Sequence, residues 1–207
     1  MMEISSIDLW LADRWYAIEG GDWSLRNHWL TYDVIHHHGK QMIIAFALGL
    51  IAVLLTSFKV GHLRIWRQPV AYVLTSIVLL PSLAASLKKI NTVVCPAELM
   101  RYGGELAYRH NFEYEFTLDA AGHCFPSGHA SGGFALIALY FASLGYSNRP
   151  WRFALPGIFI GIIFALGQQA RGQHFLSHDL WTVTICWFGA LALFVVFRPY
   201  QMQWKKT

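Results

Sequence analysis

The sequence predicts an all-α fold, an integral membrane helical bundle of about five transmembrane helices. The first observation is composition: 55% of the 207 residues are hydrophobic and 14% are charged, whereas a soluble domain carries roughly 25% charged residues. The second is that apolar stretches near the roughly 17–25 residues of a spanning helix recur along the chain. These stretches are 41–58, 70–87, 130–145, 152–167 and 180–197. We therefore expect a membrane-embedded domain over residues 41–197 and a basic C-terminal tail over 198–207.

Residues 1–40 mix four tryptophans with charged side chains, so no run there is apolar enough to span. This pattern predicts an amphipathic segment at the membrane interface. No signal peptide is recognisable, so the first span must act as the insertion signal. His36, His37 and His38 invite a metal interpretation, but three adjacent histidines cannot all face one ion from regular secondary structure. A solvated loop next to the membrane is the favoured interpretation.

Five spans make the chain alternate between two faces of the membrane. Residues 1–40, 88–129 and 168–179 then share one face, and the opposite face carries a dense set of basic residues, namely Lys59, Arg64, Arg67, Arg149, Arg198, Lys205 and Lys206. Basic loops favour the cytoplasm. We therefore expect an integral protein of a bacterial inner membrane whose first face is extracytoplasmic. Cys95 and Cys124 lie on that oxidising face and Cys186 inside a span, so either a Cys95–Cys124 disulfide or two free thiols is compatible with the sequence.

A polar, turn-forming run precedes the span at 130–145: His123-Cys124-Phe125-Pro126-Ser127-Gly128-His129. Ser127, Gly128 and His129 fall where the first unpaired N–H groups of a helix point outward with the positive end of its dipole. A hydroxyl, a glycine and an imidazole at that position suit a phosphate. The alternative is an ordinary turn and helix cap.

Two further polar groups lie on the same predicted face. Lys88 ends the second span, where it either binds an anion or extends its amine to the membrane surface. Arg101 follows in the loop, where Glu98 or Glu105 offers an ordinary ion pair.

The segment 168–179 before the last span holds His174, His178 and Asp179. If the helix already runs here, the two histidines lie one turn apart on one face. A carboxylate beside a histidine fixes its tautomer, as a histidine nucleophile or base requires.

Together these residues resemble the type 2 phosphatidic acid phosphatase superfamily, which is related to the vanadium haloperoxidases. The resemblance covers roughly 41–197 and rests on Pro126-Ser127-Gly128-His129, on His174-Phe175-Leu176-Ser177 with a nearby Asp, and on Lys88 ahead of Cys95-Pro96. It implies a metal-independent membrane phosphatase that acts on a lipid phosphate or diphosphate through a phosphohistidine. No metal, cofactor or nucleic-acid partner is expected.

Carried over by position, the resemblance makes His174 the nucleophile, Asp179 its orienting group and His129 the general acid. Lys88, Ser127 and the Gly128 N–H would hold the phosphate oxygens.

The chain departs from the family pattern at three places. Cys95 and Gln168 occupy positions where the family has arginines, and we expect Arg171 and Arg101 to supply the lost charge. The place of the orienting Asp is taken by His178, so either Asp179 or His178 plays that part. The family usually has six spans, and the missing one corresponds to the first.

Candidate substrates are undecaprenyl diphosphate, phosphatidylglycerol phosphate, phosphatidate and the phosphates of lipid A. A lipid-to-lipid phosphotransferase would use the same phosphohistidine. One alternative from another class is a zinc-dependent membrane hydrolase in which the metal ligands are His123, His129, His174 and His178. Asp179 would then hold these ligands in place without binding the metal itself. A second alternative is a non-catalytic relative that keeps the fold.

Overall fold

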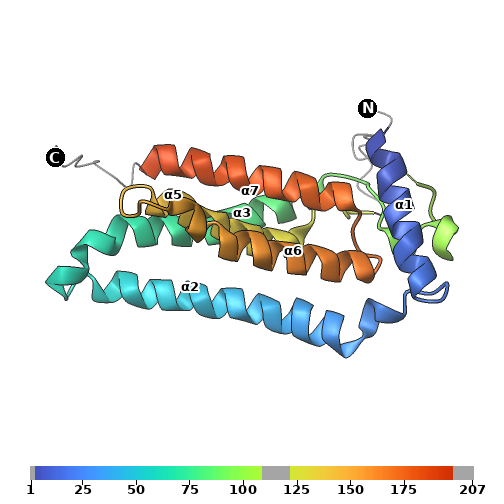
Figure 1. Ribbon diagram of the computed structural model, residues 1–207, viewed down its shortest axis with the longest axis horizontal. Coiled ribbons are helices and arrows are strands. Elements are labelled where there is room, and N and C mark those ends of the chain that lie inside the picture. The colour runs from blue at the N-terminus through green and yellow to red at the C-terminus, as the bar shows by residue number, and fades with distance from the viewer. Residues whose placement is uncertain (1–2, 109–121, 198–207) are drawn as a thin grey trace.

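The computed structural model describes residues 3–108 and 122–197 (Figure 1). Within these ranges the chain is helical and forms no strand, apart from an isolated bridge between Leu99 and Leu106. The expected all-α bundle is therefore confirmed. The predicted basic tail at 198–207 lies outside the described residues.

Within the described residues, seven α-helices and seven 3-10 or π-helical segments follow one another along the chain. The α-helices are α1 (Glu3–Ile18), α2 (Gly39–Thr56), α3 (Arg67–Lys89), α4 (Gly128–Phe134), α5 (Ala138–Ser143), α6 (Leu155–Ala170) and α7 (Leu176–Phe197). The 3-10 or π-helical segments are η1 (Ser24–Asn27), η2 (Leu30–His38), η3 (Gly61–Trp66), η4 (Pro96–Glu98), η5 (Met100–Tyr102), η6 (Ala135–Ile137) and η7 (Pro150–Phe153). The π-helical η2 runs directly into α2, and α4, η6 and α5 follow one another without a break.

Four of the described helical stretches are long and apolar enough to cross a membrane. They are Leu30–Thr56, Gly61–Lys89, Pro150–Ala170 and Leu176–Phe197. The fifth predicted span, 130–145, belongs to the shorter run formed by α4, η6 and α5 between Gly128 and Ser143. Ala130, Ala135 and Ala138 in this run are completely buried. It is an inner helix whose small side chains face its neighbours, which explains why its apolar character resembles that of a lipid-facing span.

The first span begins earlier than the sequence predicts. Residue 41 was the expected start, but the helix already runs from Leu30. The prediction of a loop at His36, His37 and His38 is therefore wrong, because all three lie in η2. A helix satisfies its own backbone hydrogen bonds, and its polar side chains can lie at the membrane surface near its end.

The inner helix packs closely against α6 because glycines replace side chains at the crossing. A Cβ added to Gly133 would lie 2.6 Å from the backbone nitrogen of Gly161, and one added to Gly157 would lie 2.6 Å from that of Ile137. Real Cβ atoms do not approach backbone so closely, so a larger residue would push the helices apart.

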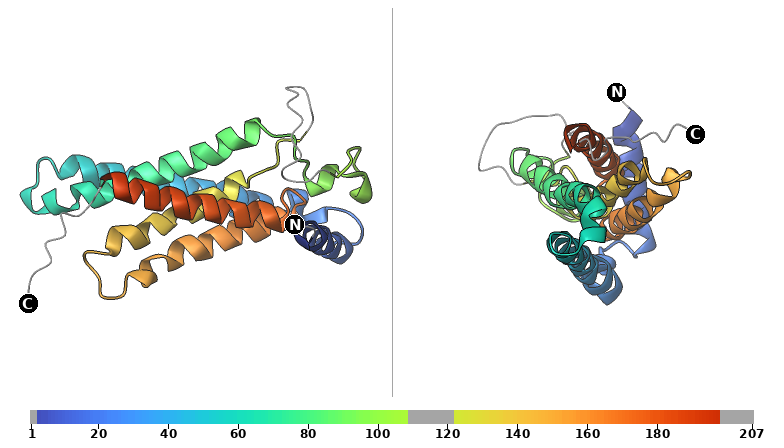
Figure 2. Two further views of the ribbon diagram at one scale, coloured as in Figure 1. Left: turned by 90° about the horizontal axis from the view of Figure 1, so that it is seen from above. Right: turned by 90° about the vertical axis from the view of Figure 1, so that its left-hand side faces the viewer.

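Helix α2 stands apart from this tightly packed centre, as Figures 1 and 2 show. Of its most apolar window only 6% is buried inside the protein, compared with 50% for the span that contains α6. It contacts the bundle mainly through α3, and η2 contacts α6.

Helix α1 lies across the end of the bundle at which α2 begins and α7 begins (Figure 1). A small hydrophobic core forms at this end of the bundle from Ala12 of α1 together with Trp23, Val94, Leu99, Tyr102 and Phe175. Asp8 of α1 is buried and accepts a 2.8 Å hydrogen bond from the Ser177 backbone N–H in the first turn of α7. It thus caps a helix that is distant in sequence.

Candidate active site

The polar motifs of the sequence meet at the end of the bundle that α1 covers. Lys88 lies in the last turn of α3, and the ring of His123 contacts its carbonyl oxygen through Nδ1 at 3.1 Å. Asn91, just after α3, donates to the carbonyl of Phe125, just before α4. Neighbouring antiparallel helices therefore bring segments separated by more than 30 residues to one place.

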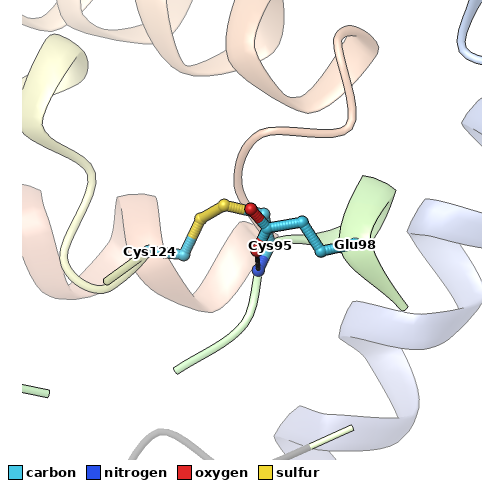
Figure 3. A group of neighbouring side chains, drawn as sticks. All are labelled: Cys95, Glu98 and Cys124. Atoms are coloured by element: carbon cyan, nitrogen blue, oxygen red, sulfur yellow. Dashed lines mark hydrogen bonds between the residues drawn. A yellow bond between two sulfur atoms is a disulfide. The ribbon is translucent and has the colours of Figure 1, made fainter. Parts of the chain in front are cut away.

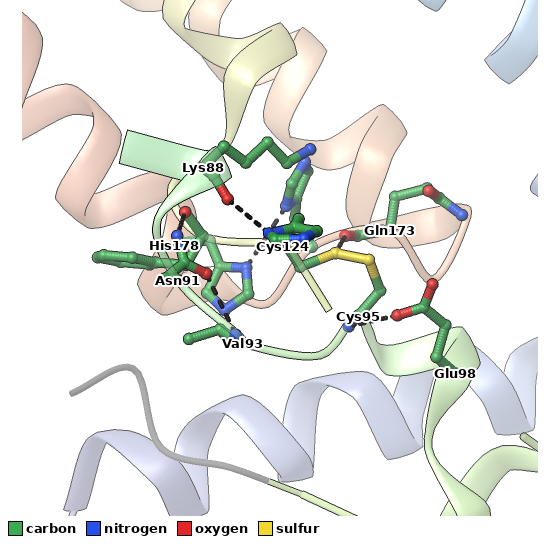
Figure 4. The surroundings of a disulfide bond; sticks show 11 residues. Lys88, Asn91, Val93, Cys95, Glu98, Cys124, Gln173 and His178 are labelled. Atoms are coloured by element: carbon green, nitrogen blue, oxygen red, sulfur yellow. Dashed lines mark hydrogen bonds between the residues drawn. A yellow bond between two sulfur atoms is a disulfide. The ribbon is translucent and has the colours of Figure 1, made fainter. Parts of the chain in front are cut away.

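A disulfide joins Cys95 to Cys124, with their Cα atoms 5.3 Å apart (Figure 3). Lys88 at the end of α3 and His178 in the first turn of α7 are among the residues that surround the disulfide (Figure 4). The Cys124 sulfur is 3.1 Å from the Gln173 carbonyl oxygen. The bridge thus ties the segment after α3 and the segment before α4 to the loop that carries His174.

The loop between α6 and α7 places His174 by two tight turns. Gly172 adopts a φ of +63°, which glycine tolerates best. The N–H groups of Gly172 and Gln173 return to the carbonyls of Gln169 and Gln168 at 2.9 Å each. His174 follows directly, before the start of α7, and only 5% of it is exposed.

His178, rather than Asp179, contacts His174. The Nδ1 atoms of the two rings are 3.4 Å apart, and His178 is completely buried. One of these nitrogens must donate and the other accept, so the tautomers of the two rings depend on each other. If His174 Nδ1 carries the proton, its Nε2 keeps the lone pair that a nucleophile needs.

Asp179 faces a different partner. Its Oδ2 accepts a 2.7 Å hydrogen bond from Gln169 Nε2, and the hydroxyl of Ser127 also lies beside the carboxyl group. Successive helical residues are rotated by about 100°, so the side chain one position beyond His178 points elsewhere. Of the two orienting groups left open by the sequence, the geometry favours His178.

The electrostatic surroundings of His174 favour its neutral form. Burial lowers the pKa of His174 well below its usual value, and the charges of Lys88 and His178 lower it further. The backbone oxygen of Cys124 opposes this shift. A neutral imidazole is the form with a free lone pair.

His129, in the first turn of α4, lies among aromatic and basic groups. Its ring stacks on Phe164 with centroids 4.2 Å apart, and it meets the ring of His36 at 4.6 Å. Its Nε2 donates to the Ile35 carbonyl at 3.2 Å, because a carbonyl can only accept. This leaves Nδ1 as the nitrogen available to exchange a proton with a ligand.

The Ser127 side chain is completely buried, and its hydroxyl lies beside the carboxyl group of Asp179. Its backbone N–H donates to the hydroxyl of Thr182 at 2.9 Å, which fixes the turn before α4. Gly128 lines a cavity, described below, and a Cβ there would meet no atom within 4 Å. The turn therefore leaves space beside the first residues of α4.

Arg171 and Arg101, the two arginines expected to supply the missing charge, differ in position. Arg171 is buried, donates from Nε to the Arg26 carbonyl at 2.8 Å, and lies 5.1 Å from the ring centre of Tyr32. Burial lowers the pKa of His129, and the charges of His36 and Arg171 lower it further.

Arg101 does not join the site in this structure. It forms a two-pronged ion pair with Asp13 of α1, with N–O distances of 2.8 and 2.7 Å. Its side chain is 55% exposed, and the guanidinium lowers the pKa of Asp13. The arginine's donors face α1, so the expectation that it closes over a phosphate is not supported.

A zinc site formed by the histidines also gains no support from the geometry. Within residues 3–108 and 122–197, the group whose ligand atoms approach closely enough to hold an ion is Cys95, Glu98 and Cys124. Its two sulfurs are bonded to each other, so neither is available as a thiolate (Figure 3). Glu98 instead accepts a 3.2 Å hydrogen bond from the Cys95 N–H.

A cavity of about 480 Å³ opens between α2, α3 and α4. Lys88, Gly128 and His129 line it, together with two residues that the sequence analysis did not assign to the site, His36 and Lys40. The available signal was their spacing of four residues, which places both on one face of a helix at the membrane end of a span.

Comparison with known proteins agrees with the resemblance noted in the sequence. The family model described as the PAP2 superfamily matches residues 69–202, which is more than half of the chain. No curated protein and no solved structure matches the chain. The matched region contains the end of α3, the turn before α4 and the His174 loop, and the chain belongs to the PAP2 superfamily.

Proposed function

We propose that this protein is a membrane phosphatase that removes phosphate from a lipid phosphate or diphosphate through a phosphohistidine on His174. Membership in the PAP2 superfamily supports a phosphatase activity on phosphate esters. The observation that carries the mechanism is the buried pair of His174 and His178, with Lys88 and His129 acting on it from the neighbouring cavity.

In the first half-reaction His174 Nε2 attacks the phosphorus, an N–P bond forms, and the bond to the leaving oxygen breaks. The leaving oxygen takes the Nδ1 proton of a doubly protonated His129, whose Nε2–H stays on the Ile35 carbonyl. Lys88 and Arg171 supply positive charge, and the Gly128 N–H borders the cavity where the phosphate oxygens would lie. In the second half-reaction His129 Nδ1 takes a proton from water, whose oxygen attacks phosphorus. The N–P bond then breaks, its electron pair returns to His174 Nε2, and inorganic phosphate is released.

The active-site end is proposed to face the extracytoplasmic side of a bacterial inner membrane. The disulfide between Cys95 and Cys124 supports this orientation, since such bonds persist in oxidising compartments. Non-reducing mass spectrometry of protein extracted from membranes should find these two cysteines linked and Cys186 free. Alkylation of both thiols without reductant would contradict the orientation.

The function is tested by phosphate release from a panel of lipid monophosphates and diphosphates, with and without a chelator. The purified protein should release phosphate equally in both conditions, and His174→Ala should lose turnover because the covalent step has no other nucleophile. Loss of activity on chelation would favour the zinc-dependent alternative. Absence of turnover on every substrate would favour a non-catalytic relative.

Hydrolysis and lipid-to-lipid transfer share the same phosphohistidine, so product analysis with an added acceptor lipid separates them. Release of inorganic phosphate without a phosphorylated acceptor is the result expected for a hydrolase.

A further inference from the structure

The cavity beside His129 is polar at one end and apolar at the other. On the α2 side it is lined in order by His36, Lys40, Ile43, Ile44 and Ala47. These positions follow the three- and four-residue spacing of a single helix face. Eleven residues of helix rise about 16 Å, so the cationic end and the aliphatic end are separated by roughly that distance.

On the α3 side of the cavity, basic and aliphatic residues follow one another in the same direction as on the α2 side. Lys88 lies at the cationic end of α3, and Pro81, Val78 and Ile77 follow toward the middle of the helix. Gly132 and Phe164 also line the cavity. Two antiparallel helices thus place their basic residues at one end and their aliphatic residues at the other, which matches a molecule with an anionic head and a hydrocarbon chain.

The cationic end of the cavity has a second lysine in addition to Lys88. Lys40 and Lys88 both line it, and none of the described residues that line the cavity is acidic. His36 also contacts His129, the proposed acid, with ring centroids 4.6 Å apart.

The backbone of η2 brings His36 into this position. Residues Leu30–His38 form a π-helix. This wide helical turn is rare in proteins, and where it occurs it often lies at a functional site. The same segment gives the Ile35 carbonyl to His129. This segment therefore contacts the catalytic end of α4 at two adjacent residues.

On these observations, and resting on the proposed function, we propose that His36 and Lys40 form a second phosphate subsite that selects lipid diphosphates over monophosphates. The terminal phosphate lies toward Lys88, His129 and His174, and the lipid-linked phosphate lies against His36 and Lys40. The hydrocarbon chain then follows Ile43, Ile44 and Ala47 between α2 and α3.

The reaction is consistent with this placement of the two phosphates along the cavity. Attack of His174 Nε2 on the terminal phosphorus breaks the bond to the bridging oxygen, and the electron pair leaves with the lipid monophosphate. The bridging oxygen takes the proton from His129, whose ring touches His36. A cation beside the leaving phosphate stabilises the charge that develops there.

The test compares two substrates with the same chain, farnesyl diphosphate and farnesyl monophosphate, by steady-state phosphate release in detergent. The variant is Lys40→Gln, and the matched control is Lys89→Gln, which removes the same charge from an exposed residue at the same end of the bundle but outside the cavity. Thermal unfolding of both variants checks that they remain folded.

Lys40→Gln should lower kcat/KM for the diphosphate about tenfold, equivalent to about 1.4 kcal/mol of transition-state binding. For the monophosphate it should stay within about twofold of the wild type, and Lys89→Gln should change neither value. Inorganic diphosphate should also inhibit Lys40→Gln more weakly than the wild type, with inhibition by inorganic phosphate unchanged.

Equal losses on both substrates, or a Lys40→Gln enzyme indistinguishable from Lys89→Gln, would overturn the subsite while leaving the phosphatase intact. In the latter case Lys40 only extends its amine to the membrane surface. A wild-type protein that releases phosphate from neither substrate would overturn the proposed function and this inference with it.

Discussion

Replacing His178 tests whether this residue orients the nucleophile. His178→Leu fills nearly the same buried space but removes the ring nitrogen that lies 3.4 Å from His174 Nδ1. A hydrogen bond between two neutral groups contributes about 0.5–1.5 kcal/mol net, and the length of this one does not favour the upper end. Loss of that contact should lower kcat by roughly two- to fivefold. KM should change by no more than about twofold, because His178 does not line the cavity.

The assay is steady-state phosphate release by His178→Leu, His178→Gln and Asp179→Asn, each checked for thermal stability. The glutamine keeps an acceptor and should lose less activity than the leucine. Asp179→Asn should affect kcat least, because the hydrogen bond of Asp179 goes to Gln169. A larger loss in Asp179→Asn than in His178→Leu would refute the assignment of the orienting role to His178.

Three further outcomes are expected. Arg171→Lys should cut kcat/KM about tenfold relative to an Arg149→Lys control, since lysine loses the planar donor that also bonds the Arg26 carbonyl; equal kinetics would mean that the phosphate is held otherwise. Because the folded-state pKa of His174 lies below its usual value of about 6.5, the unfolded chain binds more protons below that pH. Stability should therefore fall as the pH drops from about 6.5, and His174→Gln, followed by thermal unfolding, should fall less steeply. Asp8→Ala should lower the unfolding free energy by about 1 kcal/mol through loss of the cap on Ser177, and unchanged denaturation would show that water replaces it.

The sequence by itself determined the fold class and most of the site. Long apolar stretches can satisfy their backbone in a membrane only as helices, so composition and length were sufficient to predict an α-helical bundle. The positions of Lys88, His129 and His174 at helix ends followed from polar residues that interrupt apolar runs. Alternation of the spans was enough to bring these ends to one face.

Tertiary structure decided the details that depend on direction and neighbours. Whether His178 or Asp179 faces His174 depends on where α7 begins and how it is rotated, which periodicity alone does not fix. Arg101 pairs with Asp13, 88 residues earlier in the chain, and no local sequence pattern predicts that contact. His36 and Lys40 line the cavity because the π-helical start of the first span packs against α6 and contacts His129 of α4. Such contacts arise from packing between distant segments, and the sequence encodes them only through the complete fold.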